Sequence, residues 1–294
     1  PDLLAAGAVS VAIQREPDTR LHVALGDGTV AILTHEPDEE VICWSTWEGD
    51  TGTAPTVEKV AVLPGVGEDA VFYHIRRTIN GATKRYLEKW AKESECEGDT
   101  GLTWLMDCAK SYTDTGRNTA LVDIATHLVN ESVVVWSDDT GSIPGVDRSP
   151  GWGASQTRFT VDTGGDVTLS VAVHHAVAGL PYVADWRSSK LAYAAEAGTA
   201  LAQVKRVAQM ALALYQCHND GIRFGSDSGN LDSLPRVISG ATVDSDAIHS
   251  ATDLVAIPFP GTHDPDARLH IRAQSPRPCT ALALIPSVQT NERL

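Results

Sequence analysis

The clearest alternation of apolar and polar positions runs through residues 71–90, VFYHIRRTINGATKRYLEKW, and is interrupted by Asn80-Gly81. Asn-Gly suits a two-residue type I′ turn, in which both central residues take a positive φ. A turn at this dipeptide places Ile75 opposite Tyr86. Because side chains alternate across a strand, one face of the predicted hairpin is apolar and faces a core, while the other is mixed. The apolar face holds Val71, Tyr73, Ile75, Tyr86 and Trp90.

The tip of this hairpin is basic. The same register places Arg77 opposite Lys84 and Arg76 opposite Arg85. Like charges directly across a ladder are mildly destabilising, so the tip is expected to have an acidic partner. Two interpretations remain open: a solvated tip with neighbouring carboxylates, or a contact site for another protein made by these four residues.

Earlier in the chain, strand patterns occupy residues 9–15, 21–25, 29–33 and 41–47, followed by residues 57–63 before the hairpin. Asp27-Gly28 marks a second hairpin tip, which predicts one shared face for Val23, Leu25, Val30 and Ile32. The strands form two successive groups, each about 45 residues long, the size and up-and-down order of propeller blades. An ordinary meander folded into a sandwich is the alternative.

The pattern changes after the acidic residues Glu93, Glu95, Glu97 and Asp99. Strands are predicted at 133–136, 158–161 and 166–173, separated by turns rich in Asp, Gly and Pro. We interpret residues 96–190 as a small inserted β domain of sandwich type, which follows a blade region at 1–95.

Residues 191–294 are predicted to form a β-rich closing domain with one helix. The Ala-rich run 192–209 has apolar residues at helical spacing. A strand is predicted at 210–218, which Asp220-Gly221 turns back into a strand at 222–225 as a hairpin. Further strands are predicted at 254–259, 267–274 and 279–290, with a turn at 275–278. The predicted fold class is therefore mainly β, with antiparallel meanders resembling part of a propeller, an inserted β domain and one short helix.

Charge narrows the function classes. The 294 residues include 38 acidic and 23 basic side chains, for a net charge of −15. Such a chain has little positive charge to hold a phosphate backbone, so specific nucleic-acid binding is not expected, although DNA could pass nearby without adhering.

The 5 cysteines are scattered without a CxxC pair, which favours neither a zinc site nor a disulfide scaffold. No apolar run approaches the length of a membrane helix, so no membrane anchor is expected. The chain starts at Pro1 rather than Met, and we expect it to be part of a longer protein.

Motifs for catalysis are not found: there is no GxSxG, HExxH, phosphate-binding loop or GxGxxG before a helix. The sequence therefore predicts neither an enzyme nor a bound cofactor. His174-His175 is expected at the end of a strand, with the two rings on opposite faces, which does not suit one metal ion. The aspartates at 244, 246, 264 and 266 are explained by turn chemistry, with calcium as the alternative.

Tryptophans offer one candidate contact. Trp44 and Trp90 fit strand faces and are predicted to be buried in a core. Trp152, within Pro150-Gly151-Trp152-Gly153, is expected in an exposed loop and is the candidate contact residue.

Several segments resemble tail tubular protein B, the nozzle protein family of short-tailed bacteriophages. The likeness is carried by CWSTW (43–47), VEKVAVLPG (57–65), RRTINGATKRYLEKW (76–90), AGLPYVADW (178–186), LAYAAEAGTALAQVKRVAQMALALYQC (191–217) and DARLHIRAQSPRPCTALALIPSVQT (266–290). It is weakest over residues 97–160. These motifs are structural, so the resemblance carries over no active site.

The resemblance implies a hexameric ring in the virion tail, assembled in the bacterial cytoplasm below the portal and adaptor. Tail fibres would dock around it, and the genome would leave through it. Two alternatives from other classes are a phage protein that binds or depolymerises carbohydrate through exposed Trp and paired acids, and a calcium-stabilised adhesive module.

Overall fold

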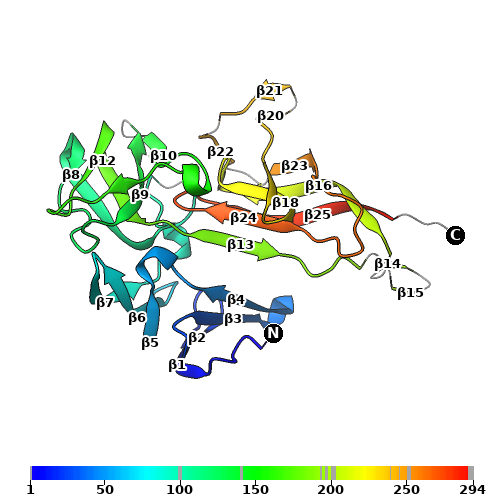
Figure 1. Cartoon of the computed structure of the whole chain (residues 1–294), viewed down its shortest axis with the longest axis horizontal. Helices are drawn as coiled ribbons and strands as arrows, with labels where there is room; N and C mark the ends of the chain where they lie inside the picture. The colour runs from blue at the N-terminus through cyan, green and yellow to red at the C-terminus, as the bar shows by residue number, and fades with distance from the viewer. Residues whose placement is uncertain are drawn as a thin grey trace.

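The computed structural model describes residues 2–98, 101–139, 142–192, 194–195, 198–199, 203–238, 240–244, 246–249 and 253–290 (Figure 1). Within these residues the fold is mainly β and its named sheets are antiparallel, which confirms the predicted class. The described helices are four single turns of 3-10 type: η1 (Pro37–Glu39), η2 (Thr51–Thr53), η3 (Glu93–Glu95) and η4 (Gly153–Ser155). No helix in this part of the chain is long and apolar enough to cross a bilayer.

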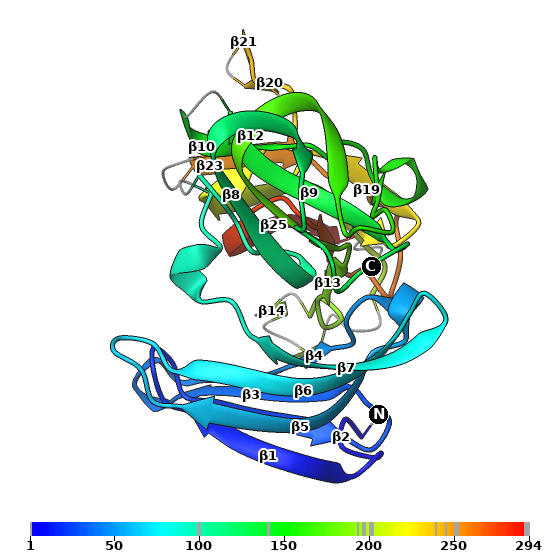
Figure 2. The same ribbon diagram turned by 90° about the vertical axis from the view of Figure 1, so that its left-hand side faces the viewer.

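The amino-terminal unit consists of two meanders, and their strands lie where the sequence predicts them. The first sheet has the order β1-β2-β3-β4, with β1 (Ala8–Gln14), β2 (Arg20–Leu25), β3 (Val30–Glu36) and β4 (Val41–Trp47). The second has the order β5-β6-β7, with β5 (Thr56–Leu63), β6 (Ala70–Ile79) and β7 (Ala82–Lys89). Figure 2 shows both sheets together at the bottom of the molecule. They share one core: Ala24, Val30, Ile32, Val57, Val60, Val71, Tyr73 and Ile75.

The hairpin of β6 and β7 has the predicted register. Ile75 pairs with Tyr86, and Asn80 and Gly81 take φ values of 49° and 74°. The turn dipeptide therefore determines the pairing here, as expected.

The hairpin of β2 and β3 differs from prediction by one residue. Its loop is wider than Asp27-Gly28 alone, because the Leu25 N–H bonds to the Thr29 carbonyl, and Ala24 pairs with Val30. A one-residue slip moves a strand's side chains to the other face. Val30 and Ile32 thus lie in the shared core, whereas Val23 and Leu25 lie with Ala31 on the opposite face of the sheet. The predicted common face is wrong, and both faces of this sheet are apolar.

The middle unit is a five-stranded sheet. It contains β8 (Asp107–Leu121), β9 (Ser132–Asp139), β10 (Ser142–Asp147), β11 (Phe159–Thr160) and β12 (Val167–Leu180), in the order β10-β9-β12-β8 with β11 beside β9. β8 and β10 were not predicted, because their sequences are too polar to show an apolar alternation. Ile79, at the tip end of β6, belongs to the core of this unit, so the hairpin tip packs against it.

The closing unit contains two sheets packed on a common core. One has the order β13-β24-β18-β19, with β13 (Val183–Arg187), β24 (His270–Gln274), β18 (Ile222–Asp227) and β19 (Asn230–Ser233). The other has the order β23-β16-β25, with β23 (Asp253–Pro258), β16 (Lys205–Tyr215) and β25 (Thr280–Thr290). Buried side chains of β16, β18, β23 and β24 form one cluster, which includes Met210, Phe224, Ile257 and Ile271.

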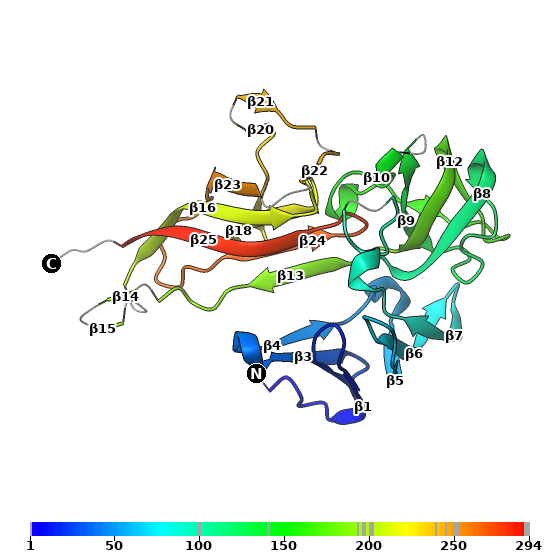
Figure 3. The same cartoon turned by 180° about the vertical axis from the view of Figure 1, so that it is seen from behind.

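Three two-stranded ladders complete this unit: β14 (Ala194–Ala195) with β15 (Gly198–Thr199), β17 (Cys217–His218) with β22 (Ile248–His249), and β20 (Val237–Ile238) with β21 (Ala241–Thr242). Figure 3 shows the long strands of the closing unit extending away from the middle unit. β13 pairs with β24, so hydrogen bonding joins residues 183–187 to the closing sheet rather than to the middle one.

Two predictions for this unit are wrong. The run 192–209 contains no helix where it is described: it includes β14, β15 and the start of β16, and residues 193, 196–197 and 200–202 lie outside the described ranges. β16 is the central strand between β23 and β25, and these ladders outweigh the helix propensity of its alanines. For the same reason β16 forms no hairpin with β18, which pairs with β19 and β24 in the other sheet.

Candidate functional site

The basic hairpin tip does not present four free cations. Arg76 and Arg85 both lie near Glu58, with Arg85 Nε 3.1 Å from its Oε2 and Arg76 Nε 3.7 Å from its Oε1. Lys84 is exposed and forms no ion pair with any described residue. Arg77 lies on the core face of β6, as the alternation of Val71, Tyr73 and Ile75 requires.

Arg77 is the centre of a buried polar cluster. Its side chain is 0 % exposed, and it donates to both oxygens of Glu88, at 2.7 and 2.8 Å, and of Asp107, at 2.9 and 2.7 Å. Asp107 also accepts the Asp50 N–H at 2.8 Å. Burial alone would lower the pKa of Arg77, but the hydrogen bonds and charges of the two carboxylates raise it above its ordinary value. The acidic partner expected for the tip is thus present, and it joins the amino-terminal unit to the first strand of the middle one.

A groove of about 410 Å³ lies beside the tip, lined by Asn80, Lys84, Tyr86 and His127 among others. The Tyr86 hydroxyl donates to the His127 carbonyl at 2.8 Å, and the Asn80 N–H donates to Glu131 at 2.8 Å. These bonds hold the tip against the middle unit. Of the four basic tip residues, Arg76, Lys84 and Arg85 are exposed, and Lys84 is the one without an ion pair among the described residues.

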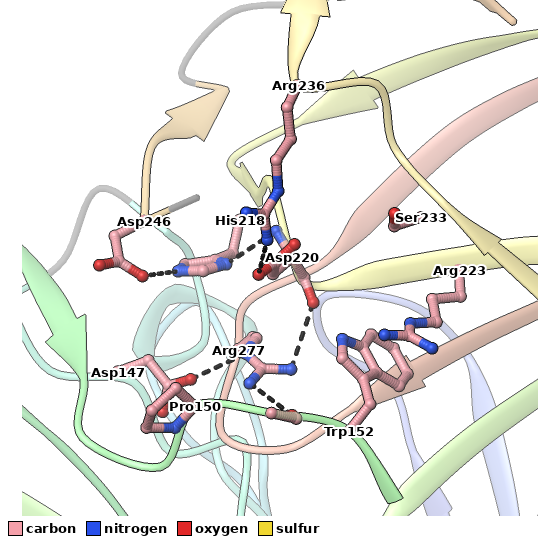
Figure 4. A pocket seen from close by; sticks show the side chains of 11 residues that line it. Asp147, Pro150, Trp152, His218, Asp220, Arg223, Ser233, Arg236, Asp246 and Arg277 are labelled. Atoms are coloured by element: carbon pink, nitrogen blue, oxygen red, sulfur yellow. Dashed lines mark hydrogen bonds and ion pairs between the residues drawn. The ribbon is translucent and has the colours of Figure 1, made fainter. Parts of the chain in front are cut away.

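Trp152 lies apart from the hairpin, in the loop between β10 and η4, and it is half-buried rather than exposed. It lines a pocket of about 360 Å³ between the middle and closing units (Figure 4). The pocket also contains three arginines and three aspartates: Arg223, Arg236, Arg277, Asp147, Asp220 and Asp246. These residues come from three separate stretches of the chain, 147–152, 218–246 and 277, so the sequence pattern indicates no group beyond Trp152 itself.

Arg277, in the turn between β24 and β25, forms the floor of the pocket. Its Nε donates to Asp147 Oδ2 at 2.8 Å, and the two side chains are 1 % and 2 % exposed. Its terminal nitrogens donate to the carbonyls of Gly151, at 2.7 Å, and Asp220, at 3.3 Å. Burial raises the pKa of Asp147, and the charge of Arg277 opposes that rise. This pair joins the middle sheet to the closing unit.

The wall of the pocket carries the other cations. Arg236 lies 3.2 Å from Asp220 Oδ2, whereas Arg223 forms no ion pair with any described residue and stacks on Trp152, its Cζ 4.6 Å from the ring centroid. His218 is 1 % exposed and its Nε2 has no hydrogen-bond partner among the described residues. Figure 4 shows Asp246 on the far side of His218 from Asp220.

A third feature is an apolar surface on the first sheet. Because Val11 pairs with Val23 and Ile13 with Leu21, these side chains share the face of β1–β4 turned away from the common core. Five of the residues on this outer face are between 44 % and 70 % exposed: Val9, Val11, Ile13, Ile42 and Trp44. The predicted core position of Trp44 is therefore wrong. Trp90 is also partly exposed, although its ring lies 5.7 Å from Tyr73.

Other candidate ligands have structural partners. His174 and His175 lie inside β12, not at its end as predicted, and both backbone N–H groups donate to Asp138 Oδ1 at 3.0 Å. The Asp246 and Asp266 N–H groups donate to Asp244 and Asp264, as turn chemistry predicts. Within the described ranges, no three His, Cys, Asp or Glu side chains gather as a metal site would require.

Comparison with known proteins adds no family. No protein-family model matches the chain, and the search of curated proteins finds no match.

Proposed function

We propose that this chain is a structural subunit of a bacteriophage tail, of the tail tubular or nozzle type, that assembles with copies of itself. The proposal is supported by the resemblance of several segments to that family and by the antiparallel sheets. The observation that carries it is the outer face of β1–β4, where Ile42 and Trp44 remain exposed beside the buried Val23. An apolar sheet face of this kind is typical of a surface that docks on another protein.

A second copy of the chain is the proposed partner, and charge restricts its contact to this face. Each copy carries a net charge of −15, so two copies repel each other over most of their surfaces. Along the four strands, the outer face holds no Asp, Glu, Lys or Arg, because the charged residues of β2 and β3 point to the other side. Self-association through this face would bury apolar area without bringing carboxylates together.

In the proposed assembly, six copies surround a channel through which DNA passes without specific binding. A negatively charged wall repels phosphates and prevents adhesion during ejection. The portal, the adaptor and the tail fibres are the proposed neighbours, and the virion is the proposed location. A positive potential on the channel face of an assembled ring would refute this account of the charge.

The test is electron microscopy and sedimentation velocity of the full-length protein, with variants of the outer face. We expect rings with a central hole, and we expect Ile42→Ser with Val11→Ser to give monomers. Leu87→Ser is the matched control, because Leu87 on β7 is 71 % exposed and Ile42 is 70 % exposed. Compact monomers of the unmodified protein at all concentrations would contradict the proposal, as would rings formed by the Ile42 variant.

A second candidate function, binding or depolymerisation of a phage receptor glycan, is favoured by one observation: the pocket that contains Trp152 and three aspartates. Asp147 and Asp220 are already paired with arginines, which leaves Asp246 as the carboxylate best placed to meet a sugar hydroxyl. Incubation with host polysaccharide distinguishes the two activities, because depolymerisation shortens the chains and binding alone does not.

A further inference from the structure

The pocket beside Trp152 contains one guanidinium that no carboxylate neutralises. Arg277 is paired with Asp147 and Arg236 with Asp220, but Arg223 has no ion-pair partner among the described residues. Its Nε is buried without a hydrogen bond, and its guanidinium lies over the Trp152 ring. Stacking of this kind holds the planar group in place and leaves its edge available for a bidentate acceptor.

His218 supplies a second unused donor. Its Nδ1 accepts the Asp220 N–H at 3.1 Å, so the proton of the neutral ring is on Nε2. Burial lowers the pKa of His218 to about 4, which keeps the ring neutral at pH 7. Asp246 Oδ1 is 3.7 Å from Nε2, beyond hydrogen-bonding distance. A donor 1 % exposed and without an acceptor at the edge of a pocket is costly unless a ligand or a water molecule satisfies it.

The charges limit what the pocket accepts. Three arginines face three aspartates, so the charges of the pocket balance as a whole. Two of the pairs are closed, which leaves Arg223 without a paired carboxylate, and Figure 4 shows it on the opposite side of the view from the half-exposed Asp246. A monoanion fits this arrangement, whereas a phosphate dianion would also meet the repulsion of Asp220 and Asp246. Asp246 and Ser233 provide oxygens for hydroxyl groups of the same ligand. The volume, about 360 Å³, is at the small end of the range for ligand sites.

We propose that this pocket binds a hydroxylated monocarboxylate, a sugar acid of the uronic type, with its carboxylate on Arg223 and its hydroxyls toward His218 Nε2 and Asp246. The inference rests on the pocket alone and holds whether or not the chain assembles into a ring. Within the second candidate function it names the ligand class.

The experiment is a titration of the full chain with D-glucuronate, followed by calorimetry or amide NMR. Glucose, D-glucuronamide and inorganic phosphate are the comparison ligands. We expect glucuronate to bind at least tenfold more tightly than its neutral amide and than phosphate. Arg223→Gln should weaken glucuronate binding at least tenfold, and Arg223→Lys, which keeps the charge but not the fork, should weaken it less. Arg206→Gln, an exposed arginine on β16, is the control and should bind as the unmodified protein does.

Equal affinity for glucuronate and glucuronamide would overturn the assignment of the carboxylate, even if a neutral glycan still bound. Tighter binding of phosphate would overturn the charge argument. Unchanged affinity in Arg223→Gln, with an unchanged melting temperature, would overturn the site itself. Each outcome is separate from ring formation, which the outer-face variants test.

Discussion

Arg77 on β6 and Asp107 at the start of β8 form a two-pronged ion pair, with N–O distances of 2.7 and 2.9 Å, that crosses from the amino-terminal unit to the middle unit. A second buried pair, Arg277 with Asp147, crosses from the closing unit to the middle unit. Each boundary of the middle unit is thus held by an arginine whose charge is fully desolvated. Separating either pair would leave a buried carboxylate without its cation, which costs free energy. The two pairs therefore favour one orientation of the units relative to each other.

Arg77→Met is expected to destabilise the protein by about 3–5 kcal/mol, since it leaves Asp107 and Glu88 without their cation. Lys84→Met, on the same hairpin but exposed, should change the free energy of unfolding by less than about 0.5 kcal/mol. Urea unfolding followed by Trp fluorescence measures both changes. A small effect of Arg77→Met would mean that the joint does not depend on this pair.

Gly81→Ala isolates the cost of the hairpin turn. Gly81 has a φ of 74°, and a Cβ built on it meets nothing within 4 Å, so the cost is purely conformational. We expect a loss of about 1 kcal/mol from the left-handed backbone. Gly116→Ala is the control, because Gly116 has no positive φ and its added Cβ would lie 3.9 Å from the Asn118 side chain. Equal losses in both variants would contradict the assigned turn.

The sequence was most informative where local chemistry alone decides the structure. Asn80-Gly81 determines both its turn and its register, and the alternating strands of residues 9–89 are all present. The register predicted from Asp27-Gly28 is wrong because the same residues are compatible with a wider loop. The resulting shift of one residue exchanges the two faces of the strand. That slip hid the outer apolar face, which is now the main support for an assembly role.

Long-range pairing accounts for the other failures. The alanines of 192–209 favour a helix locally, but Val207 and Gln209 lie in a central strand whose neighbours come from residues 253–258 and 280–290. The Trp152 pocket likewise gathers residues from 147 to 277. Local sequence patterns contain no information about such long-range contacts, so the sequence indicates Trp152 as a contact residue but not its partners.

Stability should fall on mild acidification because of His22. Its Nδ1 lies 2.6 Å from the Tyr73 hydroxyl and its Nε2 3.1 Å from Gln14 Oε1, and burial lowers its pKa from 6.5 to about 4. Between these values the unfolded chain binds the proton and the folded one does not, so the free energy of unfolding decreases as pH falls. The slope approaches about 1.4 kcal/mol per pH unit for this residue, and the buried His218 adds a similar contribution.

Urea titrations from pH 7 to pH 4.5 measure this slope. His22→Gln should be less stable at pH 7 but should show a shallower loss toward acid pH. His263→Gln, at an exposed position, should leave the slope unchanged. The same slope in His22→Gln as in the unmodified protein would show that another group causes the acid sensitivity.

The five thiols should differ widely in reactivity, which tests the exposure of Cys43 and the burial of Cys108 and Cys217. Cys43 is exposed on β4, whereas Cys108 and Cys217 are buried. Burial raises the pKa of Cys96 to about 12 and that of Cys108 further. The hydrogen bond with Cys279 together with burial raises the pKa of Cys217.

Because the accessible thiolate is the reacting species, Ellman's reagent at pH 8 should give one fast phase of a single thiol. Cys43→Ser should abolish that phase, and all 5 thiols should react in guanidinium chloride. A fast phase that survives in Cys43→Ser would contradict the exposure of Cys43 on β4.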